Sequence, residues 1–93
     1  MSAAPFGAAP GVAVEEELDC RGLPCPAPVL ALAKAARARG DRAAGTVLAV
    51  VAEDPAARID VPAWCRMRRH DYLGADTAAD GVARHVVRLG DAV

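Results

Sequence analysis

Aromatic residues, net charge and long apolar segments are all scarce in this sequence. One Trp, one Tyr and one Phe occur among its 93 residues, and the formal net charge is −1. A charge so close to zero argues against a protein that holds nucleic acid mainly by electrostatic attraction. The longest run of large apolar residues, 46–52, is far too short to cross a bilayer. A chain of this length forms one domain and is too small for a large cofactor enzyme with separate nucleotide and substrate sites.

Cysteine is also scarce, and the start of the chain lacks the features of a secretory signal. Three cysteines are an odd number, which does not suit a disulfide framework, so we expect reduced thiols. The first residues carry neither a positive charge nor a leucine-rich stretch, and we therefore expect a cytoplasmic protein. Proline and glycine disfavour regular structure here, so residues 1–13 are predicted to be a disordered tail and residues 14–93 the folded domain.

The spacing of apolar residues predicts alternating strands and helices. In chain order, the predicted elements are a strand at 14–19, a helix at 26–39, a buried strand at 46–52, a helical turn at 55–59, a helix at 61–70, and strands at 71–77 and 82–89. Asp54 and Asp60 are expected to cap helices, and Pro62 inside one continuous helix would cost about 3 kcal/mol. The order β-α-β-α-β-β predicts an α/β fold, a two-layer α/β sandwich in which two helices cover one face of a mixed four-stranded sheet.

One cysteine lies where chemistry and packing explain it about equally well. Cys25 directly precedes the helix predicted at 26–39, and Pro26 then falls at the first helical position, where a missing N–H is harmless. Pro28 also fits the first turn. Ser, Asp or Asn would cap this helix better, so a cysteine beside two prolines at a helix start is either a small buried apolar residue or a functional thiol. The helix dipole lowers the pKa of such a thiol only modestly, and Arg21 is a candidate source of further positive charge.

The stretch around Cys25 reads Leu-Asp-Cys-Arg-Gly-Leu-Pro-Cys-Pro-Ala-Pro-Val over residues 18–29. This pattern, with Glu-Asp-Pro at 53–55 and Asp-Val-Pro-Ala-Trp-Cys at 60–65, resembles the TusA/SirA-like family of sulfur carriers over about residues 15–90. The resemblance implies a β-α-β-α-β-β sandwich similar to the C-terminal domain of translation initiation factor three. It also implies that Cys25 carries a persulfide, which a cysteine desulfurase or a rhodanese-type donor supplies and an acceptor protein receives.

Two positions depart from the family pattern. Ala27 lies between the two prolines, where the family often has an acidic residue. Cys20, five residues before Cys25, lies where the family often has a small unreactive residue. We expect Cys20 to be a core residue at a strand end, with a redox partner or sulfur relay as the alternative. The routes known in the family are tRNA thiolation, oxidation of reduced sulfur compounds, and molybdenum-cofactor or selenium metabolism, and the resemblance does not choose among them.

The third cysteine and the two histidines are expected to be structural. Cys65 lies beside Trp64 on a predicted helix and is expected in the core. His70 and His85 are expected to be surface or strand residues rather than catalysts. A zinc site is disfavoured because the ligand spacing of zinc sites is missing. Its ligands would be Cys20, Cys25, Cys65 and His70.

Cations gather at the end of the helix predicted at 61–70. They are Arg66, Arg68, Arg69 and His70. A solvated helix end with favourable dipole contacts is the first interpretation. A docking patch for an acidic protein is the alternative, and it is favoured over tRNA contact because a single aromatic residue, Tyr72, lies nearby.

The sequence therefore predicts a sulfur carrier that works by transpersulfidation on Cys25. Pro26, Pro28 and Arg21 are expected to support the thiol. Neither a bound cofactor nor a metal ion is implied, and the expected partners are a protein sulfur donor and a protein acceptor rather than tRNA or a membrane. Two alternatives remain open: a non-catalytic interaction or regulatory domain, and a thiol-disulfide redox protein that uses Cys20 and Cys25.

Overall fold

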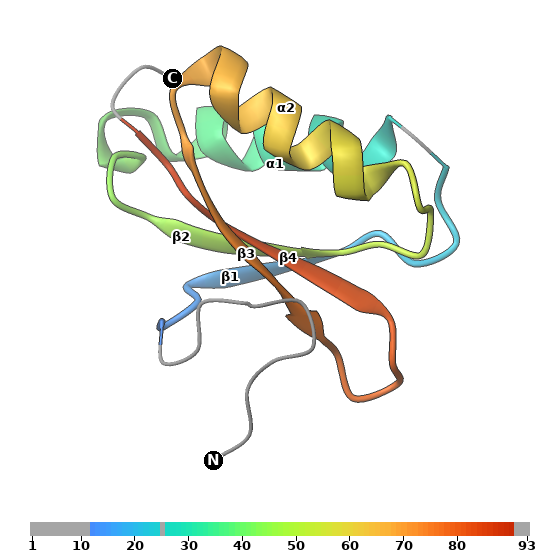
Figure 1. Cartoon of the computed structure of the whole chain (residues 1–93). Coiled ribbons are helices and arrows are strands. Elements are labelled where there is room, and N and C mark those ends of the chain that lie inside the picture. The colour runs from blue at the N-terminus through green and yellow to red at the C-terminus, as the bar shows by residue number, and fades with distance from the viewer. Residues whose placement is uncertain (1–11, 25, 91–93) are drawn as a thin grey trace.

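The computed structural model describes residues 12–24 and 26–90, and its elements follow the predicted order (Figure 1). They are β1 (Glu16–Asp19), α1 (Ala27–Arg39), the 3-10 helix η1 (Gly40–Arg42), β2 (Val47–Val51), α2 (Ala57–Arg68), β3 (Asp71–Thr77) and β4 (Ala83–Arg88). Both helices lie on one face of a four-stranded sheet, which confirms the predicted two-layer α/β sandwich. No helix in the described part of the chain is long and apolar enough to span a bilayer.

Strand β2 lies inside the sheet and organises it. The strand order is β1-β2-β4-β3, with β1 parallel to β2 and β4 antiparallel to both β2 and β3. All five residues of β2 are buried, as its continuous apolar run predicts for a strand that is covered on both faces. The crossover from β1 to β2 passes through α1. The carboxyl ends of β1 and β2 therefore lie at the same edge of the sheet.

The main core lies between the helices and the sheet. Helix α1 contributes Leu32 and Ala36, whose spacing of four residues places them on one face, as the sequence predicts. The sheet contributes Leu48, Val50 and Val87. Because burial of each large aliphatic side chain contributes roughly 1.5–3 kcal/mol, this layer contact is a principal source of stability.

A smaller apolar cluster covers the helix-free face of the sheet. Its side chains are Val47, Ala49 and Val86, with Val12, Val14 and Leu73 packed against them. Strand β3 is irregular between Tyr72 and Gly74, where its register against β4 shifts. Residues 1–11 of the predicted tail lie outside the described residues, whereas Val12 already packs against the sheet.

Helix α2 is continuous, so the predicted break before Pro62 is wrong. Pro62 lies inside the helix, and Asp60 is a helical residue rather than the cap of a second helix. Tertiary contacts explain the difference, because Val61, Trp64 and Cys65 flank the proline and are all buried. Their burial outweighs a cost of about 3 kcal/mol for an interior proline.

The starts of the two helices are close to the prediction. Asp54 acts before α2 as expected, because its Oδ1 accepts a hydrogen bond of 2.9 Å from the N–H of Ala56. The helical turn predicted at 55–59 therefore leads directly into α2. Helix α1 begins one residue later than predicted, with Pro26 at the N-cap and Pro28 in the first turn.

Both histidines are buried. His70 is 7% exposed, its ring centre lies 4.6 Å from that of Trp64, and its Nδ1 accepts the N–H of Gly90 at 2.9 Å. His70 is thus neither a surface nor a strand residue, and that prediction is wrong. His85 does lie in a strand, β4, where it is 1% exposed and its Nδ1 lies 3.0 Å from the hydroxyl of Tyr72. Burial lowers the pKa of both imidazoles, and a nearby arginine adds to the effect in each case.

We predict that acid destabilises the fold through these two buried imidazoles. Their folded-state pKa values lie below the unfolded value of about 6.5, so the unfolded chain binds protons more readily. Stability is therefore complete above the unfolded pKa and falls as the pH drops toward the folded pKa. Urea denaturation should show a falling free energy of unfolding from about pH 7 to about pH 5. The variant His85→Gln should show a shallower fall, and a fall as steep as that of the wild type would contradict the assignment.

Candidate functional site

Two loops leave the sheet at one edge. Residues 20–24, which we call the site loop, follow β1, and residues 52–56 follow the parallel strand β2. Helices α1 and α2 both start at this edge and run in the same direction (Figure 1). In open α/β sheets, ligands bind outside the carboxyl ends of the strands. This edge is therefore the candidate site. Cys25 itself lies outside the described residues, so the site is defined by the geometry of its neighbours.

Hydrogen bonds to β2 and to the loop that follows it fix the site loop. The N–H of Gly22 donates to Oε1 of Glu53 at 2.6 Å, which ties the two loops together. Gly22 has a φ of 77°, a left-handed conformation that glycine adopts without steric cost. The N–H of Cys20 donates to the carbonyl of Val51 at 2.8 Å, and the N–H of Leu23 donates to the carbonyl of Cys20 at 3.1 Å. The loop is therefore held in one conformation as it leaves β1.

Arg21 fastens the site loop to the hairpin between β3 and β4. Its Nε donates to Oδ2 of Asp80 at 2.7 Å, and its Nη1 lies 3.0 Å from Oδ1 of Asp19. Asp80 lies in the hairpin turn, and the hydrogen bond from Arg21 holds the pKa of its carboxyl below the usual range. Because two carboxylates engage the guanidinium, Arg21 serves as an anchor of the loop rather than as a free positive charge.

The neighbours of position 25 face solvent. Pro24 and Pro26 are both exposed, and a hydrogen bond of 2.9 Å from the N–H of Ala27 to the carbonyl of Pro24 spans the position. Leu23 is 47% exposed. The described part of the site is therefore an apolar turn directly before α1, accessible to a partner as large as another protein.

The other two cysteines belong to the core. Cys20 is 3% exposed and Cys65 is 1% exposed. Burial raises the pKa of the Cys20 thiol, with a further contribution from Asp19. Burial raises the pKa of Cys65 to about 12, with Asp71 adding to it. The core position predicted for Cys65 is confirmed, and neither thiol is placed to react at the surface.

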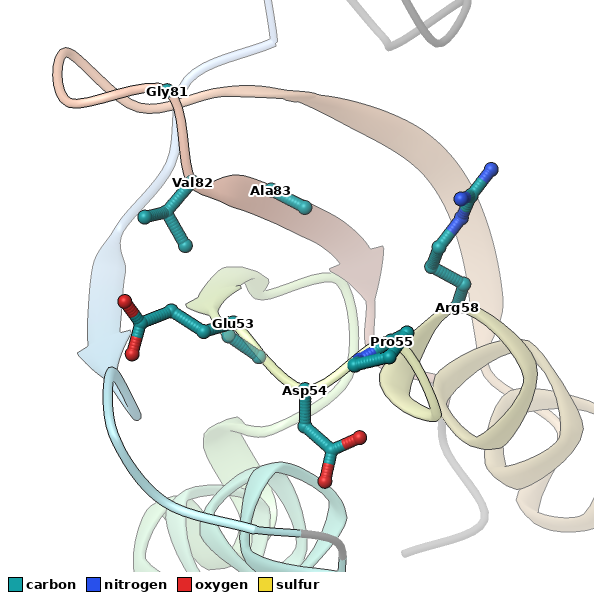
Figure 2. Close-up of a pocket in the computed structure, with 8 residues that line it drawn as sticks. Glu53, Asp54, Pro55, Arg58, Gly81, Val82 and Ala83 are labelled. Carbon is teal, nitrogen blue, oxygen red and sulfur yellow. The ribbon is translucent and has the colours of Figure 1, made fainter.

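The described residues hold no metal centre, and one pocket lies next to the site loop. None of the His, Cys, Asp and Glu side chains in that part of the chain form a group of three that could bind a metal ion. A pocket of about 300 Å³ lies between the starts of α2 and β4 (Figure 2), lined by Ala52, Glu53, Asp54, Pro55, Arg58, Gly81, Val82 and Ala83. Figure 2 shows the carboxylates of Glu53 and Asp54 turned away from each other. This lining contains no thiol, hydroxyl or imidazole, so sulfur exchange cannot use a residue of this pocket as the carrier.

Sequence reasoning did not single out Glu53 or Asp80 as site residues. Glu53 belongs to the Glu-Asp-Pro motif at 53–55, which is the signal that points to it. Asp80 lies 59 residues from Arg21 along the chain, and no local pattern connects the two.

Comparison with known proteins identifies the family and the fold to which this chain belongs. The structure is similar to the crystal structure of a SirA-like protein from Desulfitobacterium hafniense, with a TM-score of 0.68 and 23% sequence identity over 81% of this chain and 97% of that one. The family described as Sulfurtransferase TusA matches residues 16–89. The chain therefore belongs to the TusA sulfurtransferase family, whose members are sulfur carriers that interact with other proteins. The resemblance drawn from the sequence is confirmed.

The hydrogen bond between Glu53 and Gly22 is expected to contribute measurably to stability. Glu53→Ala removes the acceptor, and the free energy of unfolding in urea should fall by about 1 kcal/mol. Glu53→Gln keeps an oxygen that can accept the same hydrogen bond and should retain most of the stability. Equal losses in the two variants would show that this hydrogen bond is not what holds the loop.

Cys20 and Cys65 are expected to be unreactive in the folded protein, because both are buried and both have a raised pKa. Ellman's reagent added to native Cys25→Ser should therefore find no rapidly reacting thiol. After unfolding in urea, the same variant should react at both remaining cysteines. Rapid labelling of the native variant would contradict the burial of one of them.

Proposed function

We propose that this protein is a cytoplasmic sulfur carrier and that Cys25 holds the transferred sulfur as a persulfide. Membership of the TusA family over residues 16–89 supports the general role. The observation that carries the assignment to Cys25 is the burial of the other two cysteines, since Cys20 is 3% exposed and Cys65 is 1% exposed. With those two thiols withdrawn from solvent, Cys25 is the cysteine left for exchange with another protein.

The proposed loading step is a transpersulfidation. The Cys25 thiolate attacks the terminal sulfur of a donor persulfide, a new S–S bond forms at Cys25, and the donor's S–S bond breaks. The donor leaves as a thiolate and the product is the Cys25 persulfide, so the exchange needs no external oxidant or reductant. In unloading, an acceptor thiolate attacks the terminal sulfur, and Cys25 leaves as the thiolate.

The surroundings of position 25 support a handover between two proteins. Its described neighbours in the chain are exposed, so the active site of a partner has access. The site loop is tethered through Glu53 and Arg21, which limits how far the loop can move during the exchange. Proline fixes its own backbone φ, so Pro26 and Pro28 restrict the chain further at the start of α1. We assign Pro26, Pro28 and Arg21 the role of presenting the thiol.

Protein partners suit this surface better than tRNA. Trp64 is 8% exposed, and Tyr72 is half-buried and lies within hydrogen-bond distance of His85. The described residues therefore offer no exposed aromatic side chain on which a base could stack. We propose a cysteine desulfurase or a rhodanese-type enzyme as the donor and a protein as the acceptor.

A dithiol redox protein that uses Cys20 and Cys25 is a weaker candidate. Thiol-disulfide exchange requires a thiolate that is accessible to its partner. Burial of Cys20 and its raised pKa both oppose this requirement. The sulfur-carrier function needs no second thiol.

Intact-protein mass spectrometry tests the proposed function. The reduced protein is incubated with a cysteine desulfurase and cysteine, and separately with a rhodanese and thiosulfate. We expect a gain of the mass of one sulfur atom that a reductant reverses, because a persulfide is reducible. Cys25→Ser should show no gain with either donor.

Cys20→Ala is the matched control, because it removes a buried thiol and leaves Cys25 in place. This variant should load as the wild type does if Cys25 alone carries the sulfur. Loss of loading in Cys20→Ala would favour the redox pair, provided that its free energy of unfolding matches the wild type. A sulfur adduct that persists in Cys25→Ser, or an absence of any adduct on the wild type, would reject the proposal in favour of a non-catalytic interaction domain.

A further inference from the structure

The outer surface of the helix layer exposes large apolar side chains. Leu30 on α1 is 61% exposed, and Ile59 and Met67 on α2 are 73% and 75% exposed. Ile59 and Met67 lie eight residues apart, so they share one stripe of α2. The buried residues of both helices lie on the opposite stripes, against the sheet. These apolar groups therefore contribute nothing to the core and are available to a partner.

Positive charge lies on the same stripes. Lys34 and Arg37 follow Leu30 by four and seven residues, and Arg66 follows Ile59 by seven residues. This helical spacing places Lys34 one turn from Leu30, and it places Arg37 and Arg66 two turns from Leu30 and Ile59 on the same faces. All three cations are exposed. We name these six residues the helix-layer patch: Leu30, Lys34, Arg37, Ile59, Arg66 and Met67.

These cations differ from the arginines that stabilise the fold. Ion pairs with carboxylates are made by Arg21, Arg39 and Arg84. Lys34, Arg37 and Arg66 have no carboxylate within ion-pair distance in the part of the chain that the structure describes. Cations that make no ion pair, next to exposed apolar side chains, are typical of an interaction surface.

We propose that the helix-layer patch docks the protein sulfur donor, through a donor surface that is acidic and carries an apolar recess. This inference rests on the proposed function, because the donor is the occupant. Both helices start at the edge that carries the site loop (Figure 1). Leu30 and Ile59 lie in the first turns of the two helices, nearest that edge. A donor seated on the patch therefore covers the start of α1, where Cys25 precedes the helix.

The charge of the helix-layer patch indicates which class of partner binds there. Three unpaired cations attract an acidic surface and increase the rate of encounter. A nucleic acid would satisfy the cations but not Leu30, Ile59 and Met67, because phosphates make no favourable contact with aliphatic groups. The patch also contains no aromatic side chain on which a base could stack. An acidic protein with an apolar recess satisfies both kinds of residue.

The test compares two ways of loading the persulfide. A cysteine desulfurase with cysteine must dock, whereas glutathione persulfide is small enough to load Cys25 without docking. In Ile59→Ser/Met67→Ser, we expect the second-order rate constant of loading by the desulfurase to fall roughly tenfold. Loading by glutathione persulfide should be unchanged. Equal loss with both donors would show damage to the site or the fold and would overturn the proposal.

A matched pair of charge variants tests the electrostatic part. Arg37→Glu reverses a charge inside the patch, and Arg88→Glu reverses an exposed charge on β4, whose side chain alternates onto the helix-free face. Arg37→Glu should slow loading by the desulfurase several-fold at low salt, and the difference should shrink as salt is added. Arg88→Glu should load as the wild type does. Equal effects of the two variants would overturn the proposal.

The remaining outcomes separate this inference from the proposed function. If the desulfurase and a rhodanese both load the wild type, and the desulfurase loads Ile59→Ser/Met67→Ser equally fast, the docking proposal fails alone. If Arg37→Glu loses binding to tRNA and keeps its loading by the desulfurase, the patch is an RNA site and the docking proposal again fails alone. If glutathione persulfide modifies Cys25→Ser as readily as the wild type, the proposed function itself fails.

Discussion

The parallel pairing of β1 with β2 determines where everything functional lies in this protein. Because the two strands run in the same direction, the loops that follow them leave from the same edge, and α1 and α2 start there together. The hydrogen bond from the N–H of Cys20 to the carbonyl of Val51 extends this pairing into the site loop. An antiparallel β1 would bring its loop to the opposite edge, away from Glu53 and from α2. The burial of all five β2 residues fixes this pairing in the centre of the molecule.

Arginine residues divide into two groups with different roles. Arg21, Arg39 and Arg84 each join parts of the chain that are distant in sequence, through carboxylates on β1, on β3 or in the hairpin turn. Such exposed ion pairs are each worth about 0–1 kcal/mol, so their value lies in the position that they give to the segments they join. Arg37 and Arg66 join nothing in the described part of the chain. The chain therefore uses some of its cations for internal geometry, whereas others make no ion pair within the described residues, although its net charge is only −1.

The order of elements was predictable from local sequence, because apolar spacing and turn residues act over a few positions. The position of Cys25 before a helix was visible for the same reason. Three features were not predictable in this way. The continuity of α2 through Pro62 depends on burial of Val61 and Trp64, which only the sheet provides. The burial of His70 depends on Trp64 and on the backbone of Gly90.

The tethers of the site loop were the third feature that local sequence did not reveal. Gly22 and Glu53 are 31 residues apart, and Arg21 and Asp80 are 59 residues apart. The spacing of apolar residues along the chain gives no information on contacts between residues so far apart in sequence. The Glu-Asp-Pro motif at 53–55 marks its position as unusual but does not name its partner. Local patterns thus located the segment that we propose to be reactive, and tertiary contacts hold it in place.

The tether between Arg21 and Asp80 has a consequence for local opening of the chain. The carboxylate of Asp80 also accepts a hydrogen bond from the N–H of Val82. The same side chain therefore stabilises the turn before β4 and holds Arg21 of the site loop. Fraying of the hairpin tip removes one anchor of the loop and leaves those to Glu53 and Val51, and an anchored loop in turn opposes fraying of the tip. Local opening of the two segments is therefore coupled, although they are 59 residues apart in the sequence. The lifetime of the site-loop conformation therefore depends in part on the hairpin between β3 and β4, which lies outside the proposed reaction.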